Sequence, residues 1–156
     1  MTPMNPDFVQ IRRARADEVV DLRHVILRAG LGRATAEFDG DHDAQTIHIA
    51  GFTTENVVVA CASFLRRDHP DSREPAWQLR GMAVRQDLQG RRLGARLLEF
   101  GERAIREHDG PRLLWCNARI PAAAFYERNG WTRQGDEFIV ETAGPHVRMF
   151  KRLSSG

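Results

Sequence analysis

Residues 77–108 read WQLRGMAVRQDLQGRRLGARLLEFGERAIREH, a stretch that holds a strand, a turn and a helix in immediate succession. Its first part, 77–84, is largely apolar and shows no helical period, which predicts a β-strand. The next six residues, 85–90, are polar and end in glycine, which is typical of a turn. From Arg91 onward, apolar residues recur on one side, opposite arginines and glutamates, so an amphipathic helix is predicted, with Leu93, Leu97, Ala104 and Ile105 on its apolar side.

A strand that enters a glycine-bearing turn and then a helix leaves main-chain N–H groups free in front of the turn. These groups and the helix dipole favour an anion, above all a phosphate. Gly90 and Gly94 would let a ligand approach the backbone, and four arginines would add positive charge: Arg85, Arg91, Arg92 and Arg96. The alternative is that both glycines only end the turn and allow close helix packing.

Two common phosphate-binding motifs are absent from this turn. The P-loop needs a Lys-Ser or Lys-Thr pair after its second glycine, and the dinucleotide motif needs three glycines at other spacings. The segment 89–94, QGRRLG, instead resembles the pyrophosphate-binding signature [QR]-x-x-G-x-[GA] of the GNAT superfamily of acyl-CoA-dependent N-acyltransferases. Gln89 and Gly94 match this signature, whereas Arg92 stands where the family usually has glycine.

Length and composition indicate a single domain over residues 1–156 with an ordinary hydrophobic core. The formal net charge of +2 is too small to suggest bulk nucleic-acid binding. No apolar run approaches the roughly 20 residues that span a bilayer, and the first residues lack the pattern of a signal peptide. We therefore expect a cytoplasmic protein. Cys61 and Cys116 have no metal-binding spacing and are expected to be free, buried thiols.

The remaining elements are predicted from period and turn residues, in the order β-α-β-β-β-α-β-α-β-β. This order predicts a mixed sheet with helices on its faces and a first strand at its edge, and it resembles the GNAT fold. That resemblance implies an α/β (α+β), mostly antiparallel sheet with a splay between its two central strands. The predicted ranges are strands near 8–11, 46–52, 57–65, 113–116, 138–140 and 146–151, helices near 16–29 and 121–128, a loop with one helical turn at 31–46, and a last turn at 143–145.

A second motif supports the resemblance. The family follows its phosphate-binding helix with N-x-x-A-x-x-x-[YF] and then an aromatic residue after a glycine. Residues 119–131, RIPAAAFYERNGW, fit at Ala122, Tyr126, Gly130 and Trp131. Arg119 replaces the asparagine, and Asn117 lies two residues earlier. The C-terminal GPHVRM at 144–149 resembles a little-characterised bacterial branch of the superfamily.

The resemblance implies an N-acetyltransferase that uses acetyl-CoA as co-substrate, by direct attack of a primary amine, and no metal. Tyr126 matches the family tyrosine that donates a proton to the leaving sulfur. A bulge at Arg80–Met82 is plausible because Gly81 tolerates unusual dihedral angles. The implied CoA-binding residues are Met82, Ala83, Val84, Gln89, Gly90, Arg91, Arg92, Leu93, Gly94, Ala95 and Asn117.

The general base is less evident from the sequence. The family often has a glutamate on the central strand, where this chain has Gln78 and Arg80. Among the remaining candidates, His146 is preferred because histidine titrates near neutral pH. A role in capping the Gly-Pro turn is the structural alternative for His146. The other candidates are His48, Glu137 and Glu141.

Several alternatives stay open at this stage. The chain would instead be a CoA-binding or sensing module without turnover if the missing carboxylate is decisive. Tyr126 could be only a core aromatic residue, and Asn117 could only satisfy backbone groups. Cys116 follows an apolar run and is expected to be core rather than a nucleophile. The acceptor is expected to be a small-molecule or peptide amine, with no nucleic acid or membrane as partner, and a homodimer is left open.

Overall fold

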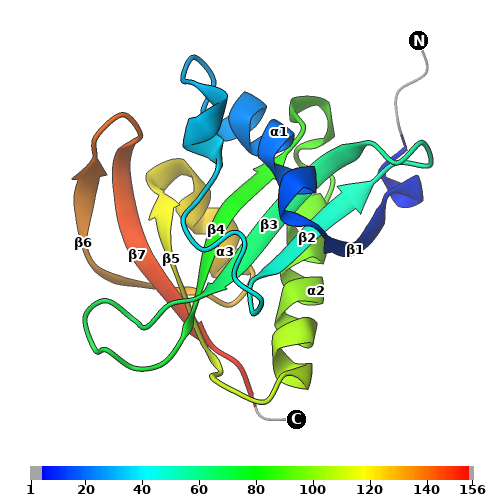
Figure 1. The fold of residues 1–156 in the computed structure, drawn as a ribbon. Helices are drawn as coiled ribbons and strands as arrows, with labels where there is room; N and C mark the ends of the chain where they lie inside the picture. The colour runs from blue at the N-terminus through cyan, green and yellow to red at the C-terminus, as the bar shows by residue number, and fades with distance from the viewer. Residues whose placement is uncertain (1–4, 155–156) are drawn as a thin grey trace.

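The computed structural model describes residues 5–154, which form a seven-stranded sheet with helices on both faces (Figure 1). The strands lie in the order β1-β2-β3-β4-β5-β7-β6, so β1 and β6 form the two edges. The predicted element order and the edge position of the first strand are confirmed. The strands are β1 (Gln10–Ala14), β2 (Ile47–Phe52), β3 (Val58–Arg66), β4 (Trp77–Val84), β5 (Leu113–Arg119), β6 (Thr132–Val140) and β7 (Gly144–Arg152).

Three α-helices connect these strands: α1 (Ala16–Leu27), α2 (Leu93–Glu107) and α3 (Ala123–Arg128). Alternate residues of β2 and β3 face opposite sides of the sheet. Ala50 and Cys61 pack with Val19 of α1, whereas Ile49 and Phe64 belong to the larger core that contains the apolar side of α2. The core therefore has two layers, one on each face of the sheet.

The centre of the sheet opens between β4 and β5. These strands are parallel and pair only at Trp77 with Leu114 and at Gln78 with Trp115, whereas every other pair is antiparallel. On its other side, β4 places Gly81 and Met82 opposite the single residue Ala62 of β3. This two-against-one count is a β-bulge, with Gly81 at a φ of 66°. The predicted bulge and splay are confirmed.

The boundaries of the first strand, the last turn and β6 differ from the predicted ones. Residues 6–8 form a 3-10 turn, so β1 starts only at Gln10. The last turn lies at 141–143, and the prediction of a turn at 143–145 is wrong because Gly144 and Pro145 already pair with β6. β6 is longer than predicted because its first six residues, 132–137, are polar or glycine and show no apolar alternation.

Candidate active site

Two cavities meet where β4 and β5 separate. The first, of about 860 Å³, lies in front of the turn before α2 and is called the turn cavity here. The second, of about 440 Å³, contains three arginine side chains and is called the arginine cavity. Both are lined by Met82, Ala122 and Tyr126, so these residues lie at the junction of the two.

The turn cavity is built around the N-terminus of α2. Gly90 and Arg92 have left-handed φ angles of 78° and 66°, and Arg92 is the N-cap. The helical hydrogen bonds begin with the N–H of Arg96, which donates to the Arg92 carbonyl at 3.1 Å. The N–H groups of Leu93, Gly94 and Ala95 precede it and have no intrahelical partner. These three N–H groups are therefore available to donate to an anion, the role that the sequence predicts for this turn.

Most of the residues predicted to bind CoA line the turn cavity. Gln89 also ties the turn to β4, since its Nε2 donates to the Val84 carbonyl at 3.0 Å. Two predicted residues do not line this cavity: Arg91, which is exposed, and Asn117, which lines the arginine cavity instead. Those that do are Met82, Ala83, Val84, Gln89, Gly90, Arg92, Leu93, Gly94 and Ala95.

The positive charge expected around the turn is mostly directed elsewhere. Arg85 pairs with Asp87 at 2.6 Å, and Arg96 donates to the carbonyls of Pro6 and Val9 at 3.2 and 2.8 Å. Of the four arginines, only Arg92 lines the cavity. The expectation that all four add positive charge at the ligand is therefore not met by Arg85 and Arg96, whose guanidinium groups pair elsewhere. It failed because main-chain carbonyls and a neighbouring carboxylate compete for guanidinium groups.

Gly94 serves packing as well as ligand approach. A Cβ at this position would lie 2.9 Å from the ring of Phe125 in α3. Glycine therefore lets the Phe125 ring close against α2 and form one wall of the turn cavity. This supports the packing alternative at Gly94, whereas Gly90 has open space around it and a left-handed φ.

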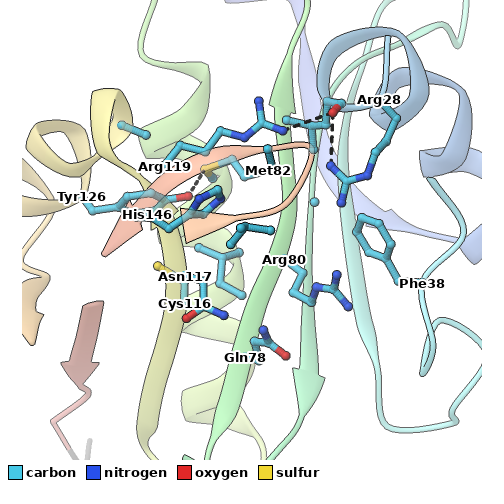
Figure 2. Close-up of a pocket in the computed structure, with 17 residues that line it drawn as sticks. Arg28, Phe38, Gln78, Arg80, Met82, Cys116, Asn117, Arg119, Tyr126 and His146 are labelled. Atoms are coloured by element: carbon cyan, nitrogen blue, oxygen red, sulfur yellow. Dashed lines mark hydrogen bonds between the residues drawn. The ribbon is translucent and has the colours of Figure 1, made fainter. Parts of the chain in front are cut away.

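Three guanidinium groups converge on the arginine cavity from different elements (Figure 2). Arg28 is the C-cap of α1, Arg80 lies on β4 beside the bulge, and Arg119 ends β5. No aspartate or glutamate is among the residues that line this cavity. Arg28 and Arg119 each donate to the Leu27 carbonyl at 3.1 Å. Within residues 5–154, the Arg80 guanidinium makes no side-chain hydrogen bond or ion pair, and it lies over the Phe38 ring at 4.2 Å from its centroid.

This arrangement is unfavourable for the arginines themselves. Burial lowers the pKa of Arg80, and the charges of Arg67, Arg28 and Arg23 lower it further. Burial and the charges of Arg119 and Arg23 lower the pKa of Arg28 in the same way. Groups with a reference pKa this high stay protonated, so the cluster keeps its charge and its mutual repulsion. An anion in the cavity would reduce the repulsion between the arginines and compensate for the burial of their charges.

A buried network supports the wall of the arginine cavity behind Phe38. Arg23 is fully buried, pairs with Asp41 at 2.7 Å and also donates to Ser63 Oγ at 2.8 Å. Asp41 accepts the Phe38 N–H at 2.8 Å, which fixes the segment that carries the ring. Burial acts to raise the pKa of Asp41, but the hydrogen bonds from Arg23 and Phe38 outweigh it and the pKa is lowered.

The network also removes one candidate base. His48 contacts Ser63 Oγ at 2.6 Å and the Asp41 carbonyl at 2.8 Å, and it lines neither cavity. Glu137 and Glu141 are exposed and line neither cavity. Of the four base candidates from the sequence, only His146 lines the arginine cavity.

His146 and Tyr126 carry the groups that could move protons. His146 Nδ1 lies 2.8 Å from the Gly144 carbonyl, an acceptor, so the hydrogen is on Nδ1 and the lone pair of the neutral ring is on Nε2. The Tyr126 hydroxyl donates to Met82 Sδ at 3.6 Å (Figure 2). Burial raises the pKa of Tyr126, with a smaller contribution from Cys116, so the phenol keeps its proton.

The two cysteines are buried free thiols, as predicted. Cys116 lines the arginine cavity, but burial raises the pKa of its thiol, so it is not a reactive thiolate. Over residues 5–154, no group of three or more His, Cys, Asp or Glu side chains could hold a metal ion. None of the helices in that part of the chain is long and apolar enough to cross a membrane.

Sequence reasoning did not identify the arginine cluster. Arg28 received no role, Arg80 counted only as a missing glutamate, and Arg119 only as a missing asparagine. The sequence did contain a signal for this cluster, because Arg80 and Arg119 both put arginine where the family usually has another residue.

Comparison with known proteins agrees with this geometry. Residues 15–131 match the family model described as the acetyltransferase (GNAT) family. An uncharacterised N-acetyltransferase of Bacillus subtilis (strain 168), YitI, is 27% identical over 147 residues, which cover 94% of this chain and 97% of YitI.

Solved structures show the same fold at low identity. Escherichia coli ElaA aligns with a TM-score of 0.75 and 17% identity, covering 92% of this chain and 99% of ElaA. An aminoglycoside 6'-N-acetyltransferase complexed with coenzyme A aligns with a TM-score of 0.71 and 15% identity, covering 92% and 96% of the two chains. The family model matches most of the chain, and the splayed strands and turn cavity fit it: this chain belongs to the GNAT family of acyl-CoA-dependent N-acetyltransferases.

Proposed function

We propose that this enzyme transfers an acetyl group from acetyl-CoA to the amine of a small acceptor that carries an anionic group. The observation that carries the proposal is the cluster of Arg28, Arg80 and Arg119 in a cavity lined by no carboxylate. A carboxylate or phosphate on the acceptor would bind guanidinium groups in forked, charge-assisted hydrogen bonds. Cationic acceptors such as polyamines would meet only repulsion there.

The turn cavity fits the co-substrate. Its free amides at Leu93, Gly94 and Ala95 suit a pyrophosphate, and Arg92 adds a charge at the same end. Its other walls are largely apolar, from Ile26 and Met82 to Phe125, and suit the pantetheine arm. The bound thioester would meet the acceptor at the junction of the cavities, beside the bulge of β4. There, a main-chain N–H of β4 could polarise the thioester oxygen.

The chain's own groups supply the proton transfers. An alkylammonium has a reference pKa of about 10.4 and must lose a proton before it can attack a thioester. His146 Nε2 carries the free lone pair and is the proposed acceptor of that proton. As the new N–C bond forms and the C–S bond breaks, the Tyr126 hydroxyl gives its proton to the departing sulfur. The acceptor nitrogen loses its extra proton to water, and Tyr126 regains a proton from water. Tyr126 fits this role because burial keeps it protonated.

The test compares matched amines that differ only in the anionic group. Amino acids and aminoalkyl phosphates are assayed beside their esters or amides, together with polyamines, and CoA release is followed. The anionic member of each pair is expected to have a kcat/KM higher by about 10- to 100-fold, the value of a hydrogen bond to a charged group. Arg80→Gln should remove this preference and leave acetyl-CoA affinity unchanged. An exposed control, Arg133→Gln, should alter neither.

Two results would contradict the proposal. Faster turnover of polyamines than of anionic amines would show that the arginines do not select the acceptor. Tight acetyl-CoA binding without amine-dependent CoA release across the panel would favour a CoA-sensing module.

A further inference from the structure

Asn117 is positioned on the acceptor side of the site, although the family resemblance implies a CoA-binding role for it. It lines the arginine cavity and does not line the turn cavity. Its partner across β5 and β7 is Arg148, just as Arg119 lies opposite His146. Directly opposed residues on one face of a sheet are close enough to interact. Figure 2 shows Asn117 on the same side of the gap as His146, facing β4, which carries Arg80.

The orientation of the Asn117 amide follows from its contact with Arg148. Arg148 Nε donates to Asn117 Oδ1 at 3.2 Å. A guanidinium has only donors, so it can hold only the oxygen end of the amide. Within residues 5–154, Asn117 Nδ2 has no hydrogen-bond partner. Two N–H donors are therefore left for a ligand, in the cavity that Arg80 and Arg119 also line.

Arg148 is itself held in place from three sides. Its Nη1 pairs with Asp71 of the loop between β3 and β4 at 3.0 Å, and its guanidinium lies 5.6 Å from the Trp115 ring and 5.7 Å from the Phe138 ring. The side chain is only 22% exposed, so the contact with Asn117 has little freedom to rearrange. An amide whose orientation is fixed in advance loses little entropy when a ligand binds.

We propose that Asn117 is a specificity-determining residue whose Nδ2 donates to the anionic group of the acceptor, and that Arg148 and Asp71 are its positioning residues. This inference rests on the proposed function, because it takes the arginine cavity as the acceptor site. It adds a neutral donor to the three arginines and places Asn117 on the acceptor rather than on CoA.

Asn117→Asp is the direct test. Aspartate has the same shape and keeps the contact with Arg148, but it puts a negatively charged oxygen where Nδ2 stands. The acceptor KM is expected to rise by about tenfold or more, the value of a lost hydrogen bond to a charged group, while the acetyl-CoA dissociation constant is unchanged. A rise in the acetyl-CoA dissociation constant instead would overturn the inference, and so would no change in either constant.

Arg148 is tested against a matched neighbour. Arg152 lies on the same strand and pairs with Glu74 of the same loop at 2.7 Å, but its guanidinium bonds to Glu74 and not to Asn117. Arg148→Met should raise the acceptor KM by about two- to tenfold, the cost of ordering a side chain that is no longer held. Arg148→Lys, which keeps a donor, should recover part of this loss, and Arg152→Met should leave both constants unchanged. Equal effects of Arg148→Met and Arg152→Met would mean that both ion pairs only fasten the loop.

The same measurements separate this inference from the proposed function. If the enzyme shows no preference for anionic amines, the proposed function fails. The Asn117→Asp shift, measured with the best acceptor found, still reports whether Asn117 faces the acceptor or CoA.

Discussion

The two cavities share three lining residues but present different groups to an anion. The turn cavity presents main-chain N–H groups from consecutive residues at the start of one helix, with largely apolar walls around them. The arginine cavity presents side chains from α1, β4 and β5, far apart in the sequence. A main-chain site suits a group common to all acyl-CoA donors, because its geometry depends little on side-chain identity. A side-chain site can change with single substitutions, which fits the role in acceptor choice that we propose for the arginine cavity.

The cost of each site also differs. Main-chain groups at a helix N-terminus are unpaired in any helix, so the turn cavity requires little beyond a left-handed residue or two. The arginine cavity instead holds several positive charges in a partly buried space, where burial and neighbouring arginines lower the pKa of Arg28 and of Arg80. Binding of an anion there should stabilise the fold as well as position the acceptor.

The largest expected effect lies at the junction of the cavities. Tyr126→Phe removes one oxygen and keeps the ring that packs between Phe125 and Trp131. Because the hydroxyl matters mainly as charge develops on sulfur, single-turnover rates should fall by about 100- to 10,000-fold, with little change in acetyl-CoA affinity. Rates equal to those of the unmodified enzyme at every pH from about 6 to 9 would make Tyr126 only a core aromatic residue.

A substitution at Gly94 should disturb the turn cavity and leave the arginine cavity intact. Leucine there would collide with the Phe125 ring and narrow the turn cavity. Acetyl-CoA affinity should fall by about tenfold or more, the usual range for overpacking, and the preference for anionic acceptors should persist. Gly32→Leu is the control, since no atom lies within 4 Å of a Cβ there. Calorimetry that gives equal affinities for Gly94→Leu and the parent would remove the cofactor site from this turn.

The contrast also explains what the sequence could predict. The turn cavity is local: the strand period, Gly90 and the apolar side of α2 all lie within 77–108, so its place was predictable. The bulge was predictable from Gly81 because one residue type signals it. The arginine cavity is not local. Arg28, Arg80 and Arg119 come together only through the sheet order and the splay, which no spacing in the sequence encodes.

Two sequence predictions were wrong for physical reasons as well. Arg96 sits at helical spacing from Arg92 and was expected at the ligand, but its guanidinium reaches the carbonyls of Pro6 and Val9 from a segment 87 to 90 residues earlier. The start of β6 was missed because residues 132–137 are all polar or glycine and exposed, and the pairing with β7 shifts register between Gln134 and Phe138. A pattern based on alternation cannot detect a strand with no buried face.

A smaller effect is expected at Arg92, where the turn uses a left-handed residue that is not glycine. Arg92→Gly restores the family pattern and should raise the free energy of unfolding by about 1 kcal/mol, because a left-handed L-residue costs about that much. Acetyl-CoA affinity should fall slightly as one positive charge leaves the turn cavity. Urea unfolding with and without acetyl-CoA measures both. Lower stability of Arg92→Gly without ligand would show that side-chain contacts of Arg92 outweigh its backbone strain.

The last prediction concerns the network behind the arginine cavity and produces no change at neutral pH. Burial lowers the pKa of His48 below its ordinary value of 6.5, so the folded protein keeps this ring neutral while the unfolded chain protonates it. The unfolded state then binds more protons, and stability falls as pH decreases below about 6.5. Asp41 acts in the same direction at more acidic pH, because its lowered pKa favours the folded state only while the carboxylate is charged.

His48→Gln should reduce the slope of unfolding free energy against pH between about 6.5 and 5, whereas substitution of the exposed His108 should not. If the slope is unchanged in His48→Gln, protons taken up elsewhere control the acid sensitivity. The wall behind Phe38 would then be independent of His48 titration, and the arginine cavity should keep its acceptor preference at mildly acidic pH.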